Sequence, residues 1–535
     1  MYFDYSWALA FGTLIISFHA TGITAYTWPS PKLDALEAAR FDQLGVNAVS
    51  AGLTSFVQPC DSFLFGDNTG RANAADWIRT AYHDMATHNS ADGTGGLDGS
   101  IRFDEEQARA ENAGDGFHNT MLIAAFLSNR YVSVADSIAL AALIAIENCG
   151  GPEIPFRGGR IDATEPNTPG VPEPQQDLDS HIASFARQGF TPTEMIGLVA
   201  CGHSFGGVQH DAFPDIVGNL NDPNNTEDVA HFDSTFSQFD NKIATEFIEG
   251  TTQNPLVVGF NDTTNSDKRI FASDGNSTMR AFADSPSLFA ATCADLFARM
   301  LDTVPSNVQL TDVLTPLPVK PSGVQLTLDG DFIQLAGQVR LWNTTEDSSR
   351  IVRMLWHDHH GGMGNATLSF TGTSSSTGGK YTAAWYAFNA SNSDSSISLD
   401  ATAGIKSLSF LVNDQLEDQD GVGFAIQDGF MFSKTSCRIQ SPFTGRFDVA
   451  VRKDVNPTRV YLEEISTDGT QKVTVTEIDI SPPTSPVFGD SAYSLWSINL
   501  TDPTTVYSIG AEIGGVKYST TDEHLFIEFP LCSGV

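Results

Sequence analysis

The sequence predicts a multidomain protein with a mainly α-helical N-terminal region followed by an all-β, β-sandwich-like C-terminal region. The chain has 535 residues, which is enough for about two to four domains, each with its own core. Apolar residues recur with helical spacing before about residue 305. After about residue 322 they alternate with polar residues, and Gly, Asn and Asp interrupt the runs every ten or so positions.

Helical spacing is clearest in segments that carry apolar residues at i, i+3, i+4 and i+7. In one of them Thr191 is in the position of an N-cap, with Pro192 at the first helical position. We therefore expect helices in these segments: 75–89, 136–149, 177–190, 191–205 and 285–301.

Alternation in the C-terminal region predicts strands within 323–342, 380–388, 407–412, 459–465 and 471–480. The region 322–535 is long enough for one sandwich or two, with a possible break near Cys437 to Thr444. Residues 306–321 are rich in proline and predict a connector between halves that fold separately. The helical domain is then expected to span residues 26–305.

The N-terminus predicts a signal peptide over residues 1–25. Its apolar run from Trp7 to Phe18 is short for a bilayer span, and small residues follow it, with cleavage expected after Ala25. A buried N-terminal helix is the alternative. Secretion is also favoured by an even number of cysteines and by seven Asn-x-Ser/Thr sequons. The sequons are at Asn224, Asn261, Asn276, Asn343, Asn365, Asn389 and Asn499.

Among the cysteines, Cys60–Cys149 and Cys437–Cys532 are reasonable disulfides within their own domains. Cys201 is either a buried thiol or the partner of Cys293, because spacing alone does not decide connectivity. The net charge is −36 and the pI about 4.4. Such a surface argues against nucleic acid and membrane partners, and it suits a mildly acidic medium. We expect a secreted, extracellular monomer.

One short motif occurs twice, as "RTAYHD" at 79–84 and "RMLWHD" at 353–358. In a helix four residues rise about 6 Å, so Arg79 and His83 share a face. Arg353 and His357 are in the alternating region, where four residues of a strand span about 13 Å and the two side chains cannot converge on one small molecule. The first copy is therefore the candidate acid–base pair.

Further motifs follow the first copy in a fixed order: "GGLDGS" at 95–100, "ENAG" at 111–114, "GHSFGG" at 202–207, "FDSTFSQFD" at 232–240 and "FASD" at 271–274. With them, residues 55–302 resemble the secreted fungal (class II-like) branch of the plant-type haem peroxidase superfamily. The resemblance implies haem b, hydrogen peroxide as oxidant, and small phenolic or other one-electron donors.

The resemblance assigns roles to individual residues. His83 and Arg79 match the distal pair that cleaves peroxide, and Asn112 matches the amide that hydrogen-bonds the distal histidine. His203 matches the iron ligand, with Asp274 as its carboxylate partner. Phe232 matches the aromatic beside the proximal ring. Tyr82 is where relatives usually carry phenylalanine or tryptophan beside the distal histidine.

The same resemblance implies two calcium ions, because carboxylate, hydroxyl and carbonyl oxygens are calcium ligands. Each expected site includes a residue that directly follows a haem histidine, Asp84 or Ser204. The distal set is Asp84, Gly96, Asp98 and Ser100, and the proximal set is Ser204, Asp233, Thr235, Gln238 and Asp240.

Departures from the family pattern narrow the range of expected substrates. The positions that match the manganese site of some members are Ala72, Asp76 and Gln209, and one carboxylate makes a poor divalent-metal site. Leu198 is at the position of the surface tryptophan of lignin-oxidising members.

The alternative function is a cell-wall polysaccharide-binding or adhesion protein with a catalytically silent helical domain. Its β region would use exposed aromatics, for which Trp342, Trp356, Trp385 and Tyr386 are candidates. The two functions can coexist. The segment "WHDHHGG" at 356–362 is either a surface metal site or a polar loop that closes a hairpin.

Overall fold

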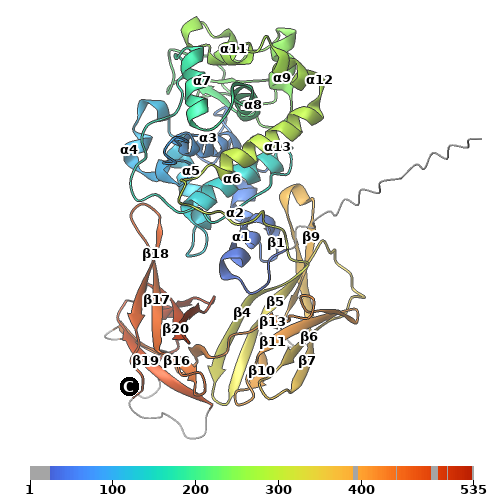
Figure 1. Ribbon diagram of the computed structural model, residues 1–535, viewed down its shortest axis with the longest axis vertical. Helices are drawn as coiled ribbons and strands as arrows, with labels where there is room; N and C mark the ends of the chain where they lie inside the picture. The colour runs from blue at the N-terminus through green and yellow to red at the C-terminus, as the bar shows by residue number, and fades with distance from the viewer. Residues whose placement is uncertain (1–24, 389–395, 441–442, 484–491, 503, 533–535) are drawn as a thin grey trace, which may run out of the picture.

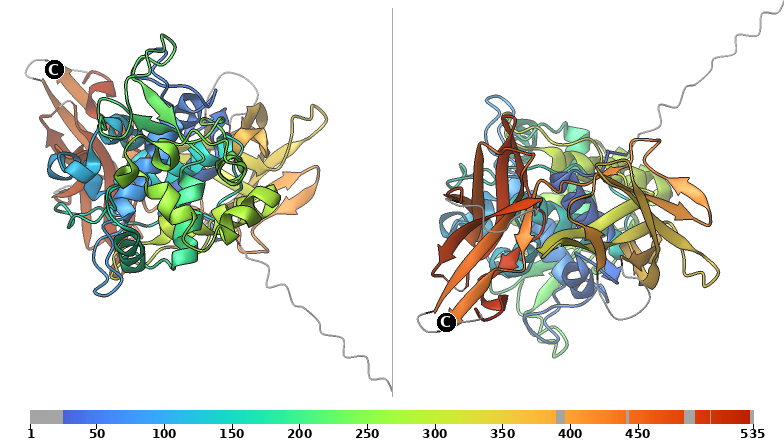
Figure 2. Two further views of the ribbon diagram at one scale, coloured as in Figure 1. Left: turned by 90° about the horizontal axis from the view of Figure 1, so that it is seen from above. Right: turned by 90° about the horizontal axis from the view of Figure 1, so that it is seen from below.

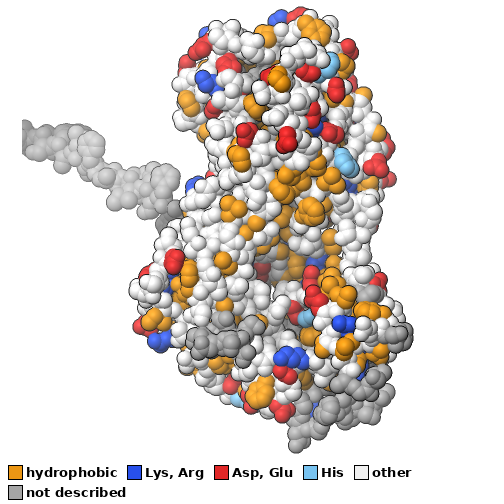
Figure 3. Space-filling view, turned by 180° about the vertical axis from the view of Figure 1, so that it is seen from behind, with side chains coloured by type: hydrophobic (Ala, Val, Ile, Leu, Met, Phe, Trp, Pro, Cys, Tyr) orange, Lys and Arg blue, Asp and Glu red, His pale blue; other side chains and the backbone are white. Residues whose placement is uncertain are grey.

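The computed structural model describes residues 25–388, 396–440, 443–483, 492–502 and 504–532. The expected signal peptide, apart from Ala25, and the sequon at Asn389 lie outside these residues. A helical part forms one end of the molecule, and two β parts lie side by side at the other end (Figures 1 and 2). On the face shown in Figure 3, hydrophobic side chains gather at the waist between them, beside a recess.

Each of the five segments with helical spacing contains a helix, as predicted, and α6 is at the centre of the helical core. Fourteen of its fifteen residues are buried, which explains why its sequence is apolar on nearly every face. The principal helices are α1 (Pro31–Phe41), α2 (Ala51–Phe56), α3 (Asn73–Met85), α5 (Gly116–Ala124), α6 (Val134–Asn148), α7 (Leu178–Arg187), α8 (Pro192–Gly202), α9 (Lys242–Glu249), α11 (Ser266–Phe271), α12 (Ser277–Asp284) and α13 (Pro286–Asp302).

The start of α8 confirms the predicted cap. The Thr191 side chain accepts a hydrogen bond from the backbone N–H of Glu194, and the Glu194 carboxylate accepts one from the Thr191 backbone, which is a capping box. The helix ends at Gly202, so His203 directly follows its last turn.

The β region has two hydrophobic cores that share one long sheet. Among the described residues, the first core lies between β4, β5, β9 and β14 of this sheet and a second layer of β6, β11 and β13. The second core lies between β14, β16 and β19 and a layer of β17 and β20. Two sandwich-like halves are thus joined through β14, and β15 pairs antiparallel with β16 where the break was considered possible.

The strands that build these layers are β4 (Val319–Asp329), β5 (Phe332–Trp342), β6 (Val352–His357), β7 (Met363–Thr367), β8 (Ser369–Ser375), β9 (Thr382–Ala387), β11 (Ser407–Val412), β13 (Phe424–Ala425), β14 (Phe430–Ser433), β15 (Cys437–Gln440), β16 (Phe443–Arg452), β17 (Arg459–Thr467), β18 (Val473–Asp479), β19 (Tyr493–Leu500) and β20 (Val506–Ile513). The second copy of the Arg-x-x-x-His motif is on β6, as predicted. Residues 358–362 close the β6–β7 hairpin, where the Asp358 carboxylate accepts hydrogen bonds from the backbone of His360 and Gly362.

The expected connector is not a free linker. The backbone N–H groups of Thr311 and Leu314 donate to the carbonyls of Gly158 and Phe156 in the helical half. Strand β4 then begins at Val319, inside the expected connector. The proline-rich segment therefore lies along the helical half, where several of its N–H groups find partners.

Helix α1 joins the two halves through buried charges. Arg340 of β5 forms ion pairs with Glu37 and Asp42, and Lys320 of β4 forms a further pair with Glu37. Glu37 and Arg340 have no exposed side-chain surface. Strand β1 (Leu44–Gly45) extends the long sheet by pairing with β8. A buried charge needs such partners, so this cluster fixes how the halves meet.

The second sandwich contacts the helical half through Arg130, whose guanidinium pairs with Glu463 of β17 at 2.7 Å and donates to the carbonyl of Thr520 at 2.5 Å. The cysteines form the disulfides Cys60–Cys149, Cys201–Cys293 and Cys437–Cys532. In the described part of the chain, no helix is both long enough and apolar enough to cross a membrane.

The aromatic side chains proposed to stack on sugars are used in packing. Trp385 and Tyr386 are buried, with only 1% and 2% of their surfaces exposed. Trp342 packs against Phe41 at the junction of the halves, and Trp356 packs half-buried against the first β core. These four side chains do not form an exposed platform.

Candidate active site

A cavity of about 730 Å³ opens in the helical half between α3, α8 and the loops around them. This volume is in the range of small-molecule and cofactor sites. Its lining includes side chains from α3 and side chains that follow α8, and six of them matter for the chemistry: Arg79, Tyr82, His83, His203, Phe232 and Asp267.

Helix α3 places Arg79 and His83 one turn apart on the cavity wall, as the spacing predicted. His83 Nδ1 lies 2.7 Å from the Asn112 side-chain oxygen. The Asn112 amide nitrogen donates to the carbonyl of Glu106 at 2.8 Å. Because the Asn112 amide nitrogen is used in this bond, the Asn112 oxygen faces His83 and accepts from its Nδ1–H. Nε2 of His83 is then left with a free lone pair.

Burial keeps this histidine neutral. Desolvation, followed by the nearby Arg79 charge, lowers the pKa of His83 to about 3. Desolvation also lowers the pKa of Arg79 to about 10, so its guanidinium still carries a charge at neutral pH. Arg79 donates to the carbonyl of Ala113 at 2.9 Å and lies 4.4 Å from the ring centre of Phe117. The wall therefore combines a neutral base with a fixed cation.

Tyr82 lies beside this pair and also lines the cavity. Its ring stacks on Phe185 with centres 6.1 Å apart and meets the His83 ring edge-on at 6.0 Å. Burial raises the pKa of the Tyr82 phenol, so it remains a neutral phenol at physiological pH. It contributes a half-buried aromatic face to the distal wall.

His203 also faces the cavity, and its partner differs from the prediction. His203 Nδ1 lies 2.8 Å from a carboxylate oxygen of Asp267 on α11, and the Asn254 amide donates to the same oxygen at 2.8 Å. The Phe232 ring stacks on the His203 ring, with centres 4.1 Å apart and planes 12° apart. With Nδ1 engaged, Nε2 is the ring nitrogen left to bind a metal in the cavity.

The prediction of Asp274 as the partner of His203 is wrong. Asp274 is exposed and caps the first turn of α12, where its carboxylate accepts from the backbone of Ser277 and Thr278. Asp267 has 1% of its surface exposed. The sequence did carry a signal: Ile270 and Phe271 follow Asp267 at i+3 and i+4, so a helix buries Asp267 with them.

The four residues of the expected distal calcium set lie in one region, and two further polar residues join them. Both Asp84 oxygens accept backbone hydrogen bonds, from Gly99 at 2.7 Å and Ile101 at 2.9 Å. The Asn167 amide donates to Asp98 and, at 3.0 Å, to the Ser100 hydroxyl. Burial and then the charge of Asp98 raise the pKa of Asp84.

A cation would offset the repulsion between these buried carboxylates, so the donor set fits calcium. Sequence reasoning missed Asn167 because it is on a distant loop. It also missed Glu106, a buried carboxylate that accepts from the backbone N–H of Asn167. Gly96 fits at its position because its φ is +118° and a Cβ there would lie 2.7 Å from the Thr303 carbonyl oxygen.

In the expected proximal set, Asp233 has an oxygen without a partner. Its Oδ2 is buried and accepts no hydrogen bond from the described residues, while Oδ1 accepts from the backbone of Thr235 at 2.9 Å. Burial, followed by the charge of Asp240, raises the pKa of Asp233 to about 7. Such an orphaned carboxylate oxygen is what a missing cation would satisfy.

The remaining members of that set make contacts of their own. Ser204 is buried and donates its hydroxyl to the Cys201 carbonyl at 2.7 Å. Gln238 is exposed, and its backbone N–H donates to the Thr235 carbonyl at 2.8 Å. Asp240 accepts from the backbone of Lys242 at 2.8 Å. Among the described residues no lysine or arginine is ion-paired to Asp233, which leaves its charge open to a cation.

Comparison with known proteins identifies the helical half. Residues 65–285 match the family model described as "Peroxidase". These residues belong to the peroxidase family. The chain is 40% identical over 354 residues to a "WSC domain-containing protein" of Arthroderma benhamiae, which covers 65% of this chain and 48% of that protein. That alignment is longer than residues 65–285, so the similarity extends beyond the peroxidase domain.

Two relatives carry activities in their names. "L-ascorbate peroxidase 5, peroxisomal" of Arabidopsis thaliana is 32% identical over 161 residues, which is 30% of this chain and 54% of that protein. "Manganese peroxidase 2" of Phlebia radiata is 33% identical over 184 residues, which is 33% of this chain and 44% of that protein. The chain spans about half the length of the curated relatives it matches.

The positions matched to the manganese site lie at the mouth of the peroxidase cavity, where an arginine pairs with the carboxylates. Asp76 pairs with Arg71 at 2.8 Å, and the same guanidinium pairs with Asp115 at 2.7 Å and Glu227 at 3.2 Å. The Gln209 amide donates to Glu227 at 2.5 Å. Sequence reasoning missed Arg71, Asp115 and Glu227, because three separate segments bring them together.

Leu198 was matched to the position of the surface tryptophan of lignin-oxidising members, and the structure places it elsewhere. Leu198 is not at a surface position: only 3% of its surface is exposed, and it lines the peroxidase cavity from α8. A side chain here contacts whatever fills the cavity rather than a large external substrate.

Proposed function

We propose that the chain is a secreted haem peroxidase that uses hydrogen peroxide to oxidise small phenolic or other one-electron donors. One observation carries the proposal. A neutral His83 held by Asn112, beside the cationic Arg79, lines the same cavity as a His203 whose other ring nitrogen is held by a carboxylate. Peroxide cleavage needs a base and a fixed positive charge near an open metal position.

Haem b would be held by Nε2 of His203. Asp267 would orient this ring and make it a stronger electron donor, and Phe232 would fix its plane. When bound, haem supplies an iron centre that takes up the two oxidising equivalents of peroxide and passes them on one electron at a time.

The other steps belong to the chain's own residues. His83 Nε2 takes the proton from the near oxygen of hydrogen peroxide and delivers it to the far oxygen, which leaves as water. Asn112 keeps Nε2 free for this by accepting the Nδ1 proton. Arg79 stabilises the negative charge that develops on the leaving oxygen, in a site where burial strengthens the interaction.

Two calcium ions would complete the site. The distal ion would bind among Asp84, Gly96, Asp98 and Ser100, and the proximal ion among Ser204, Asp233, Thr235, Gln238 and Asp240. Each ion would steady the backbone next to one of the two histidines. Disulfide bonds support an oxidising, extracellular location.

The test is the visible absorption spectrum of the purified chain, loaded with haem and calcium, before and after one equivalent of hydrogen peroxide. A haem band that shifts with peroxide and recovers on adding a phenol is expected. A band that never forms, or one that does not respond to peroxide, would overturn the proposal. Transfer of the protein into culture medium on expression from its own gene would test secretion separately.

A further inference from the structure

The charges that line the peroxidase cavity are unequal. Among the lining residues in the described part of the chain, two carry guanidinium groups, Arg71 and Arg79. Six carry carboxylates: Asp76, Glu111, Asp115, Glu173, Asp215 and Asp267. Two of the six have structural tasks, since Asp267 holds His203 and Glu111 accepts from the backbone of Gly170 and Val171.

Arg71 does not balance the carboxylates around it. Its side chain is only 8% exposed and contacts Asp76, Asp115 and Glu227. Arg79 also interacts with Asp76 and Asp115, so two positive charges face three negative ones. Asp115 remains open to solvent, with 58% of its side chain exposed. The mouth therefore keeps a negative field despite its arginine.

Two further carboxylates reach the rim from other segments. Glu173 is half-buried on the loop after residue 170, and Asp215 is exposed on the loop that follows β2 (Gly207–Gln209). Among the described residues, neither carboxylate is within ion-pair distance of a cation. Asp115, in contrast, is ion-paired with Arg71. Carboxylates from three segments thus line the cavity where it opens to solvent. A low-dielectric cavity focuses such a field on a small molecule that enters it.

We propose that the cavity selects aromatic donors that carry a positive charge, such as phenols and anilines with an ammonium group, over donors that carry a negative charge. This rests on the proposed peroxidase function and specifies its substrate class. Anionic donors such as ascorbate, which is named in some relatives, should then be poor substrates here.

Matched phenols test this on the full-length protein loaded with haem and calcium. Tyramine, tyrosol and 3-(4-hydroxyphenyl)propionate share a phenol ring and differ in a remote ammonium, hydroxyl or carboxylate group. At low ionic strength and pH 6 we expect kcat/KM to be about tenfold higher for tyramine than for the propionate. The ratio should approach one as salt reaches about 0.5 M.

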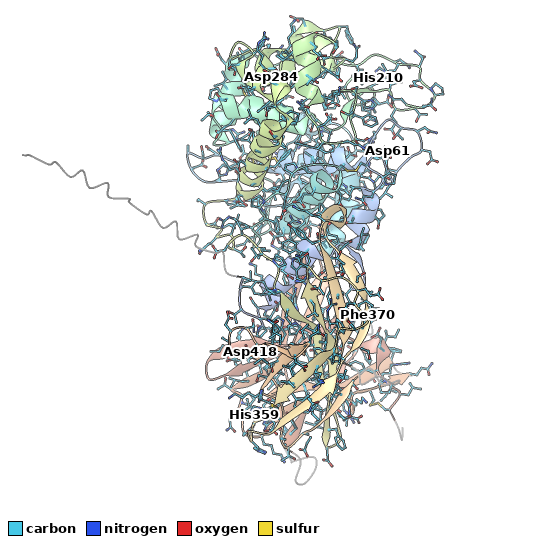
Figure 4. All side chains as sticks on the ribbon, turned by 90° about the vertical axis from the view of Figure 1, so that its right-hand side faces the viewer. Asp61, His210, Asp284, His359, Phe370 and Asp418 are labelled. Atoms are coloured by element: carbon cyan, nitrogen blue, oxygen red, sulfur yellow. A yellow bond between two sulfur atoms is a disulfide. The ribbon has the colours of Figure 1, made fainter. Side chains whose placement is uncertain are left out.

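A double variant assigns the effect to the rim. Glu173→Gln with Asp215→Asn should reduce the tyramine-to-propionate ratio by at least about threefold. Asp284→Asn is the matched control, because Asp284 is exposed at the end of α12 and does not line the cavity. In Figure 4 it lies away from His210, which follows the cavity-lining Gln209.

Binding without turnover gives a second measurement. Titration of the resting haem band with phenethylammonium and with 3-phenylpropionate yields dissociation constants, and the cation should bind more tightly. A ratio near one in both measurements, or a ratio that the rim variant leaves unchanged, would overturn the selection while leaving peroxidase function intact. If peroxide oxidises none of the three phenols, tyrosol included, the proposed function itself fails.

Discussion

The two histidines of the cavity have the same side chain in opposite surroundings. His83 is held by a neutral amide and faces a guanidinium, and its pKa falls to about 3. His203 is held by the buried carboxylate of Asp267. In the proposed peroxidase, the first environment would keep a ring nitrogen free to move protons, whereas the second would make a ring nitrogen an electron donor. The partner of Nδ1, rather than the histidine itself, would then decide the task.

The largest expected effect comes from removing the distal base. His83→Leu should lower the rate constant of the reaction with hydrogen peroxide by about 10²- to 10⁴-fold, the usual contribution of general acid–base catalysis. The haem band of the resting protein should remain, because His203 is untouched. Stopped-flow absorption measures both, and a loss of less than about tenfold would contradict the role given to His83.

Calcium removal tests the His83 side and the His203 side of the cavity at once, because Asp84 follows His83 and Ser204 follows His203 in the chain. Chelation should lower turnover and destabilise the protein by about 2.7 kcal/mol per site, if calcium was present at 100 times its dissociation constant. Proton competition at Asp233, with its pKa of about 7, should make this effect smaller at pH 5 than at pH 7.5.

Thermal unfolding with and without chelator, and metal analysis of the treated protein, give the measurement. Unchanged turnover and unfolding temperature after demonstrated loss of calcium would count against the role of these sites.

A matched pair of variants tests the proximal side. Asp267→Asn should lower haem affinity or the peroxide rate by about 10- to 100-fold, as loss of a metal ligand's hydrogen-bonding partner usually does. Asp274→Asn should leave both unchanged and change stability little, because Asp274 only caps α12 and asparagine caps a helix about as well as aspartate. Equal effects of the two substitutions on haem would contradict the assignment of Asp267.

The last effect concerns pH and the apoprotein. An unfolded histidine binds a proton near pH 6.5, but folded His83 does not until about pH 3. The free energy of unfolding should therefore fall as pH decreases from about 6.5 to about 3, by about 1.4 kcal/mol per unit from this group. Urea unfolding at several pH values should show a shallower slope in His83→Leu, and identical slopes would argue against a buried neutral His83.

Local sequence patterns predicted much of the helical half. Helical spacing placed α3 and α8, and with them Arg79, His83 and His203, because an apolar stripe must face the core. The family motif "FASD" pointed to Asp274 alone, although Asp267 also follows a serine. Burial decides between them, and it depends on how α11 packs against α8.

Contacts between distant segments could not be predicted. Arg71, Asp115 and Glu227 are each unremarkable in the sequence and meet only in the fold. Trp385 and Tyr386 were candidates for sugar stacking only within the alternative function, because on a strand the identity of an aromatic side chain does not reveal which layer covers it. Proline content suggested a connector between halves that fold separately, because it does not show where a segment docks.

The attachment of helix α1 to the β region has a consequence for biosynthesis. Glu37 and Asp42 find their partners in Lys320 and Arg340, and the backbone of Trp28 is bonded by the side chain of Gln419, 391 positions later. A ribosome must make most of the chain before these first helical residues can settle. Until then Glu37 and Asp42 lack the cations they are buried with, so a truncated peroxidase domain should depend on chaperones more than the full chain does.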